Sequence, residues 1–336
     1  MRGFVRAVCR EAALRLPTGF APRTIYMGGG TPSMLSPTHL QALVEGLQEV
    51  ISLRHVEEWS FEANPATFTP AKARQWRELG ITRVSLGAQS FEPELLHLLG
   101  RTHTPEQIGE SVRMLREAGI PQVNLDLMFS LPGQTLRQWE HTLQEALALE
   151  PQHVSTYNLT YEEDTDFFRR FGAQGTDEET DVRMFQMADE MLTEAGFRHY
   201  EISNYAREGC RSLHNLSCWR GEDFYGLGPG ACASVGARRY ANAADTTRYI
   251  AALTVEPSSL PPGTEERMTP EQRRTELIGL MVRTDEGLPG DLLRPEDARF
   301  TAMLQREGLA TLSPEGRLLL TRKGRLVADE IAVGLL

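Results

Sequence analysis

Thr24-Ile-Tyr-Met-Gly-Gly-Gly-Thr-Pro-Ser33 is the stretch that decides the fold, because a short strand pattern runs directly into three consecutive glycines. Glycine lets the backbone turn tightly and approach a ligand without obstruction by a Cβ atom, which leaves amide groups available to a carboxylate or phosphate. The spacing matches neither a Walker A loop nor G-x-G-x-x-G, which disfavours nucleotide phosphate binding by those routes. We therefore expect a strand over 24–27 and a ligand-binding turn over 28–30.

Outward from this stretch, strand patterns alternate with helical patterns as far as residue 160. Ser36, Thr69 and Thr104 each place a capping hydroxyl before a proline, and Gly80 and Gly119 follow the last apolar turn of their helices. Such alternation predicts repeated βα units around a parallel sheet, either an open Rossmann-like sheet or a partial barrel. The expected strands are 24–27, 59–63, 83–88, 123–129 and 154–160.

The alternation stops near residue 165, and an α+β extension and a small C-terminal helical domain follow. The last helices and hairpin resemble a winged-helix module, but mixed charge on its second helix favours a structural cap over DNA binding. We expect domains over 1–165, 166–256 and 257–336. The elements expected after residue 165 are a helix over 177–195 ending at Gly196, a strand over 199–205, a glycine-rich segment over 225–231, a linker over 257–263, helices over 269–283 and 295–307, and a hairpin at 314–316.

Composition is that of a globular chain of about two domains with a small third. Its 336 residues are 40% hydrophobic and 24% charged, and 35 basic against 46 acidic residues give a net charge of -11. This acidic balance offers no electrostatic footprint for nucleic acid. No apolar run approaches the ~18 residues of a membrane span, so we expect at most peripheral membrane contact. Four scattered cysteines favour a reducing compartment, and we expect the cytoplasm.

The first residues favour an amphipathic helix over a transit peptide. Arginines occur there, but the apolar segment of a secretory signal does not. The apolar side of the expected helix consists of Phe4, Val5, Val8, Ala12 and Leu16.

Polar residues lie at the ends of several expected strands. Glu62 occurs in F-E-A-N-P, Gln89 in L-G-A-Q-S-F, and Asp126 in N-L-D-L-M-F. In parallel α/β folds and barrels the carboxyl ends of the strands line the ligand site. One such residue is ordinarily a loop cap, whereas several successive ones predict a shared polar site.

These motifs resemble the radical S-adenosylmethionine (SAM) enzymes of the coproporphyrinogen III dehydrogenase type. The resemblance rests on G-G-G-T-P-S at 28–33, on the segments around Glu62 and Gln89, on Arg101 in G-R-T-H-T, and on N-L-D-L-M-F-S-L-P-G-Q-T at 124–135. Their order and spacing match over nearly the whole chain. The resemblance implies a partial (β/α)6 barrel with a helical C-terminal domain.

The resemblance also implies a SAM pocket whose residues have distinct roles. A zwitterionic amino acid needs a paired acceptor and a guanidinium, and a ribose diol suits carboxylate and amide acceptors. The implied contacts are Gly29, Gly30 and Thr31 to the amino end of the methionyl group, Glu62 to its amino group or the ribose, Arg101 to its carboxylate, and Gln89 and Asp126 to the ribose hydroxyls.

The sequence departs from this family at the iron–sulfur cluster. The family holds a [4Fe–4S] cluster with three cysteines spaced C-x-x-x-C-x-x-C, a spacing that Cys9, Cys210, Cys218 and Cys232 do not have. The family places that motif after its first strand, but only 27 residues precede Gly28 and they read as a helix. We therefore expect the first barrel strand and the cluster loop to be missing, no metal ligands in this chain, and Met1 to be a mis-assigned or truncated start.

A second motif resembles the HemW-like haem chaperones within the same family. His214-Asn-Leu-Ser-Cys-Trp219 is similar to their H-N-x-x-Y-W signature, with Cys218 in place of tyrosine. Histidine and cysteine are both axial ligands of haem iron. On the residues alone, packing in the second domain explains His214 and Trp219 better than haem binding does, and the resemblance reverses that preference. The resemblance implies haem binding at His214, Cys218 and Trp219.

The resemblance thus predicts a haem chaperone that binds SAM and haem and delivers haem to respiratory haem proteins. An oxygen-independent coproporphyrinogen III oxidase is the first alternative, and a degenerate binding domain without a cluster is the second. The sequence does not decide between a monomer and a homodimer.

Overall fold

The computed structural model describes residues 1–159, 166–172, 177–255 and 259–336, and it divides into two compact units. The first unit consists of Met1–Ile25, Leu35–Glu58 and Ser212–Leu336. The second consists of Tyr26–Met34 and Trp59–Arg211.

A seven-stranded sheet of order β1-β2-β3-β4-β5-β7-β6 forms the partial barrel that the sequence predicts. Strands β2 to β5 pair in parallel, while β7 pairs antiparallel with both β5 and β6. The strands are β1 (Thr24–Met27), β2 (Glu58–Ala63), β3 (Arg83–Gln89), β4 (Gln122–Phe129), β5 (His153–Asn158), β6 (Arg198–Glu201) and β7 (Asn204–Ala206).

The prediction of one strand over 199–205 is wrong, because a turn at Ile202 and Ser203 divides it into β6 and β7. The buried carboxylate of Glu201 closes this turn by accepting the Ser203 amide at 2.8 Å and the side-chain amide of Asn204. Because a side chain satisfies the amides of this turn, the turn leaves no break in the hydrophobic pattern from which the single strand was predicted.

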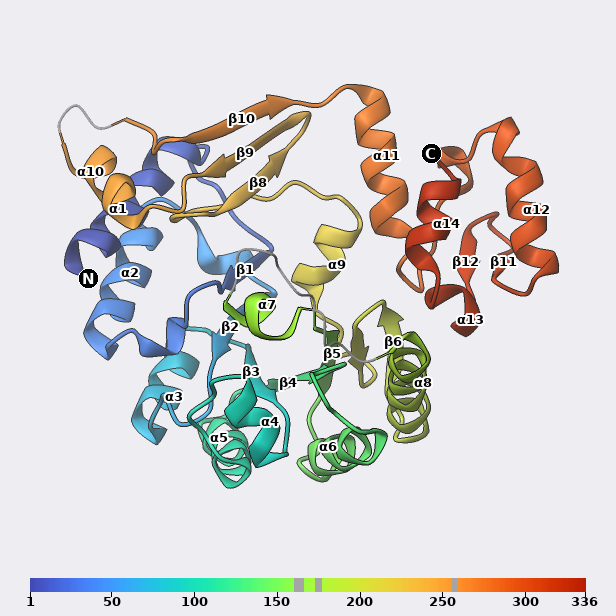
Figure 1. Cartoon of the computed structure of the whole chain (residues 1–336). Helices are drawn as coiled ribbons and strands as arrows, with labels where there is room; N and C mark the ends of the chain where they lie inside the picture. The colour runs from blue at the N-terminus through green and yellow to red at the C-terminus, as the bar shows by residue number, and fades with distance from the viewer. Residues whose placement is uncertain (160–165, 173–176, 256–258) are drawn as a thin grey trace. The chain divides into compact units, whose positions relative to one another are not determined.

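Apart from α7 (Asp166–Phe171), helices of the second unit cover the outer face of this sheet (Figure 1). Thr69 and Thr104 cap their helices as expected, and Thr104 forms a reciprocal capping box with Gln107. Trp76 and Trp139 are almost fully buried between helices and sheet. The helices are α3 (Pro70–Glu78), α4 (Pro93–Leu98), α5 (Pro105–Glu117), α6 (Leu136–Ala148), α7 (Asp166–Phe171) and α8 (Glu178–Glu194).

The first unit begins with the amphipathic helix that the sequence predicts, α1 (Arg2–Arg15), which packs against α2 (Pro37–Gln48) and α10 (Thr246–Thr254). Glu11 on α1 is fully buried yet fully bonded, since it accepts Arg15 Nε at 2.7 Å, the Gly228 amide at 2.8 Å and Tyr249 Oη at 2.6 Å. A three-stranded antiparallel sheet follows, in the order β10-β9-β8. Its strands are β8 (Cys232–Val235), β9 (Arg238–Asn242) and β10 (Gly263–Arg267).

The expected linker over 257–263 lies partly outside the described residues, and its last residue, Gly263, begins β10. Position 263 requires glycine because a Cβ on this residue would overlap the backbone carbonyl oxygen of Ala241 on the neighbouring strand.

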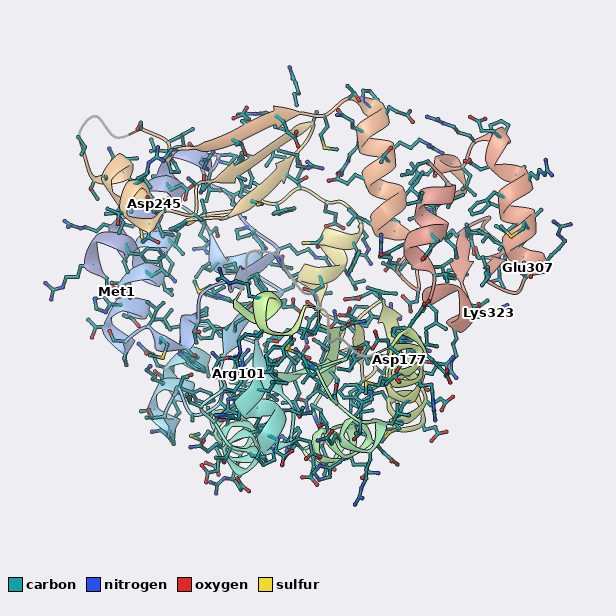
Figure 2. All side chains as sticks on the ribbon, in the orientation of Figure 1. Met1, Arg101, Asp177, Asp245, Glu307 and Lys323 are labelled. Carbon is teal, nitrogen blue, oxygen red and sulfur yellow. The ribbon has the colours of Figure 1, made fainter. Side chains whose placement is uncertain are left out.

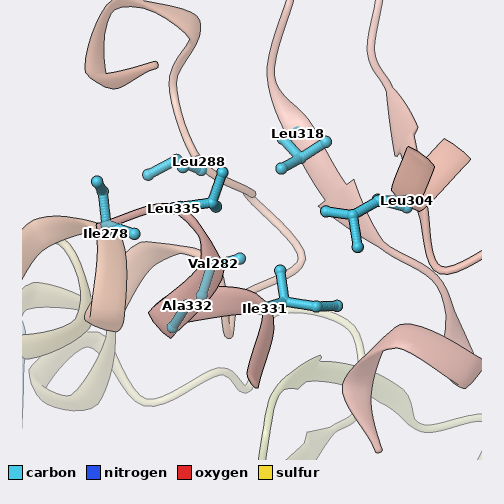
Figure 3. Packing of buried hydrophobic residues seen from close by; sticks show 9 residues of the cluster. Ile278, Val282, Leu288, Leu304, Leu318, Ile331, Ala332 and Leu335 are labelled. Atoms are coloured by element: carbon cyan, nitrogen blue, oxygen red, sulfur yellow. The ribbon is translucent and has the colours of Figure 1, made fainter. Parts of the chain in front are cut away.

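The carboxyl-terminal helices and hairpin enclose an apolar core of their own (Figure 3). Ile278, Val282, Leu288, Leu318 and Ile331 are at most 2% exposed and meet in this cluster. The elements are α11 (Pro270–Met281), the 3-10 turns Gly290–Leu292 and Pro295–Asp297, α12 (Ala298–Arg306), the hairpin of β11 (Ala310–Leu312) and β12 (Leu318–Leu320), α13 (Arg322–Arg325) and α14 (Ala328–Gly334). Among the described helices, none is long and apolar enough to span a bilayer.

Candidate functional site

A polar pocket of about 420 Å³ lies in the second unit and draws its lining from five consecutive strands of the sheet and the loops after them. This volume is within the range of sites that hold a drug-sized ligand. Six of the seven residues that the sequence assigns to SAM line it; Gly30 does not appear in the lining. The lining residues are Tyr26, Gly29, Thr31, Glu62, Ala63, Asn64, Ser85, Gly87, Gln89, Arg101, Asp126, Met128 and Tyr157.

The glycine turn after β1 brings backbone amides against a carboxylate. Glu62 accepts the Gly29 amide at 3.0 Å and also the hydroxyl of Tyr26. A Cβ on Gly28 would overlap the carboxylate of Glu62 and the ring of Tyr26, and Gly29 has a φ of 99°. This turn therefore requires glycine both for close approach and for backbone conformation.

Gln89 ends β3 with a φ of 66°, a left-handed conformation that non-glycine residues rarely adopt. The β3–β4 register shifts between Leu86 and Gln89, so an irregularity re-aims the strand end at the pocket. Gly87 makes room for it, since a Cβ there would lie 2.9 Å from both Asn64 Oδ1 and Gln89 Nε2. Strain of this kind is maintained where a side chain must face a ligand.

Arg101, which Figure 2 labels, brings a guanidinium to the pocket from the loop after α4. Its Nη1 donates to Asn64 Oδ1 at 3.0 Å, and Asn64 Nδ2 donates to Thr31 Oγ1 at 3.2 Å. Burial lowers the pKa of Arg101, and the negative charge of Asp126 opposes that change. The amide of Asn64 thus joins two predicted ligand-binding residues without neutralising the guanidinium.

Asp126 accepts hydrogen bonds at both carboxylate oxygens, one from the neighbouring strand β3 and one from its own strand β4. Ser85 Oγ donates to Oδ2 at 2.8 Å, and Asn124 Nδ2 lies 2.7 Å from Oδ1. Burial raises the pKa of Asp126 to about 6, and the negative charge of Glu62 also raises it. Hydrogen bonds from Ser85, Ser155 and Asn124 act in the opposite direction and lower the pKa. At neutral pH the carboxylate is therefore mostly ionised and suited to accept hydroxyl groups.

Seven further lining residues were not predicted from the sequence: Tyr26, Ala63, Asn64, Ser85, Gly87, Met128 and Tyr157. Strand periodicity contained part of the signal, because Ser85 lies four residues before Gln89 on one strand and Met128 two after Asp126 on another. Tyr157 lies near the carboxyl end of the next strand, β5, where the same edge of the sheet lines the pocket.

The expected haem residues lie in the first unit on α9 (Leu213–Trp219). The buried carboxylate of Glu58 accepts Ser212 Oγ at 3.1 Å and the amides of Leu213 and His214 at 3.0 Å each. A carboxylate at a helix N-terminus satisfies amides that lack a partner in the helix and opposes the positive end of its dipole.

His214 and Cys218 are one helical turn apart, with Nε2 and Sγ 4.0 Å from each other. The other ring nitrogen of His214, Nδ1, lies 3.3 Å from Thr24 Oγ1. Burial lowers the pKa of His214 against the pull of Glu58, and burial also raises the pKa of the Cys218 thiol. A neutral imidazole and a protonated thiol therefore share this part of the helix, with Trp219 at its end.

Comparison with known proteins supports one family. The model of the radical SAM superfamily matches residues 8–146. The haem chaperone HemW of Bacillus subtilis (strain 168) is 32% identical over 321 residues, which cover 92% of this chain and 84% of the relative. The haem chaperone HemW of Mycobacterium tuberculosis (strain ATCC 25618 / H37Rv) is 33% identical over 335 residues, which cover 99% and 85%. The chain belongs to the HemW family of radical SAM proteins.

The fold of this HemW-family chain agrees with a solved structure, that of coproporphyrinogen III oxidase (HemN) from Escherichia coli, described as a radical SAM enzyme. The TM-score is 0.82 at 22% identity, and the match covers 99% of this chain and 82% of the other. At this identity the similarity concerns the fold, and it confirms the expected partial barrel with helical C-terminal elements.

Membership of the radical SAM superfamily implies two groups, SAM and a [4Fe–4S] cluster. The residues of this chain fit SAM but do not fit the cluster. The glycine turn, the carboxylates of Glu62 and Asp126, and the guanidinium of Arg101 form a cradle suited to a zwitterionic nucleoside such as SAM. For the cluster, the four cysteines lack the three-thiolate spacing, and no group of three His, Cys, Asp or Glu side chains within the described ranges could hold a metal ion. No reductive cleavage of SAM is therefore assigned to these residues.

Proposed function

We propose that the chain is a haem chaperone that binds SAM in the pocket of the second unit, binds haem through α9, and delivers haem to respiratory haem proteins in the cytoplasm. The observation that supports it most is the similarity to proteins named haem chaperone HemW along nearly the whole chain. A coproporphyrinogen III oxidase and a cluster-less binding domain are the competing functions.

In this proposal each pocket residue has a role that its geometry supports. Arg101 pairs with the carboxylate of SAM, and the backbone around Gly29 to Thr31 with Glu62 receives its amino group. Gln89 and ionised Asp126 accept the ribose hydroxyls. When bound, SAM would supply a sulfonium whose positive charge faces a pocket containing two carboxylates, Glu62 and Asp126.

On α9, His214 is the better candidate for iron. Neutral imidazole binds iron without losing a proton, whereas Cys218 must first lose a proton from a thiol whose pKa burial has raised. Trp219 supplies an aromatic surface beside them on the same short helix.

Haem titration tests the chaperone function. Purified chain mixed with haem is expected to develop a Soret band distinct from that of free haem, and His214→Ala is expected to weaken the complex. Cys218→Ser is the matched control one turn away. A loss confined to Cys218→Ser would make the thiolate the ligand, whereas conversion of coproporphyrinogen III without haem binding would support the oxidase instead.

Calorimetry tests the SAM pocket separately. Glu62→Ala or Asp126→Ala is expected to remove about 1–3 kcal/mol of SAM binding, the usual cost of leaving a buried polar partner unpaired. Unchanged affinity in both variants would contradict the pocket assignment, and haem binding without any SAM binding would leave the cluster-less binding domain as the better description.

A further inference from the structure

A line of polar side chains runs from Asp126 into the sheet, from Ser85 in the pocket lining to the buried Asn124 and His153. Ser85, Asn124 and His153 are in register on the adjacent strands β3, β4 and β5, and Asp126 pairs with Ser155. Asn124 is 4% exposed and His153 is 2% exposed. Polar groups this deep in a sheet weaken the core unless their hydrogen bonds are complete, so their arrangement has to be explained.

The contacts determine which way each group donates. A carboxylate only accepts, so the Asn124 atom 2.7 Å from Asp126 Oδ1 has to be the amide nitrogen Nδ2. Asn124 Oδ1 consequently faces His153 Nδ1 at 2.6 Å, and that ring nitrogen has to carry the proton. His153 Nε2 then accepts from Tyr200 Oη at 2.8 Å.

Ser85 completes the arrangement at the other oxygen. Its Oγ accepts from Asn124 Nδ2 at 2.6 Å and donates to Asp126 Oδ2 at 2.8 Å. From Tyr200 through His153 and Asn124, every donor therefore points toward the Asp126 carboxylate. A chain of aligned donors polarises its last member and favours the charged acceptor.

We propose that Asn124 is a positioning residue that, together with Ser85 and His153, holds Asp126 ionised and aimed into the pocket for the hydroxyl groups of a ribosyl ligand. The inference rests on the proposed SAM-binding function for the identity of that ligand. The orientation of Asp126 itself rests on the contacts alone.

Other charges around Asp126 act for and against its ionised form. Glu62 on β2 disfavours it by repulsion, and Arg101 after α4 favours it. The hydroxyls of Tyr26 on β1 and Tyr157 on β5 stay protonated, because burial and the neighbouring carboxylates raise the pKa of both. Burial keeps His153 neutral by lowering its pKa, so the network supplies hydrogen bonds and no positive charge.

These charges fix the expected pH dependence. The pKa of Asp126 is about 6, so SAM affinity should fall as the pH drops below that value and the carboxyl group stops accepting both hydroxyls. Removing a donor destabilises the charged form, which raises the pKa further and moves the fall in affinity to higher pH.

The test compares Asn124→Ala and Ser85→Ala with a matched control. SAM calorimetry at several pH values is expected to show about a tenfold loss of affinity at neutral pH and a midpoint about half a unit to one unit higher in either variant. Ser85→Ala removes one hydroxyl and is the variant to rely on if Asn124→Ala does not fold. Ser111→Ala removes a fully buried serine on α5 that donates to Gln107 O and accepts the Ala66 amide at 3.4 Å, and it should leave the midpoint of the affinity fall unchanged.

Carboxyl-carbon NMR titration of Asp126 without ligand separates this inference from the proposed function. A higher Asp126 pKa in both variants supports the positioning role even if wild-type protein fails to bind SAM, an outcome that would contradict only the proposed function. An unmoved Asp126 pKa in both variants, or an equal shift in Ser111→Ala, overturns the role of Asn124.

Discussion

At the scale of single residues, Arg101 offers a test of which part of a ligand the pocket recognises. Arg101→Ala is expected to weaken SAM binding about 10- to 100-fold, because a carboxylate loses a charge-assisted, bidentate partner. Arg101→Lys should recover only part of the loss, since an ammonium lacks the planar fork.

The control for this prediction is the ligand itself. Methylthioadenosine shares the nucleoside of SAM but lacks the amino-acid carboxylate, so its affinity should hardly change in either variant. Equal losses for the two ligands would place Arg101 near the nucleoside and contradict the assigned role.

The proposed ligand contacts were easier to predict from the sequence than the residues that position those contacts. Glu62 and Gln89 lie in the last two positions of their strands, so the βα pattern alone brings them to one edge of the sheet, whereas Asp126 lies inside β4. Asn124 and Ser85 precede the strand ends, and their roles depend on cross-strand register, which the sequence does not display.

At the scale of an element, the seven-residue helix α9 depends on a residue far away in the sequence. Glu58 is 4% exposed and accepts three hydrogen bonds at the start of the helix. Glu58→Ala leaves these donors buried without their acceptor, and we expect a loss of about 1–3 kcal/mol in the free energy of unfolding. Urea denaturation measures it, and haem affinity should fall in parallel because His214 lies in the first turn.

Glu57 is the matched control for this prediction. It is the adjacent residue, and its exposed carboxylate pairs with Arg23 at the surface. Glu57→Ala should leave both unfolding and haem binding unchanged, as is usual for exposed ion pairs. Haem affinity that survives Glu58→Ala in a folded chain would show that α9 does not need this cap to bind haem.

Elements with a local signal were predicted within a residue or two, and elements with a tertiary cause were not. Thr69, Thr104 and Asp177 cap helices whose starts agree with the sequence. In contrast, the helix expected over 295–307 begins as a 3-10 turn at Pro295–Asp297, where Asp297 accepts both the Arg294 amide and the Arg274 guanidinium. The partner on α11 is distant in sequence, so no local pattern could reveal it.

At the scale of the whole molecule, the chain passes between the two units more than once, a division that composition and periodicity could not reveal. Residues 26–34 belong to the unit of the pocket although the residues on both sides of them belong to the other. The sequence could therefore supply the elements of each unit, but the grouping of those elements depends on tertiary contacts.

The C-terminal core allows the independence of these units to be measured. Leu318 is fully buried in the cluster with Leu288 and Ile331, so Leu318→Ala should cost about 2–5 kcal/mol by lost burial and the cavity left behind. Hydrogen exchange should quicken in α11 and α14 because both pack around that cluster. Exchange in β3 and β4 should stay slow, and SAM affinity should persist, since the pocket is lined entirely by the second unit.

The matched control is Leu312→Ala on the same hairpin, which removes a side chain that is 49% exposed and should change neither the stability nor the hydrogen exchange of the C-terminal core. Faster exchange throughout β3 and β4 in Leu318→Ala would mean instead that the two units unfold as one cooperative body.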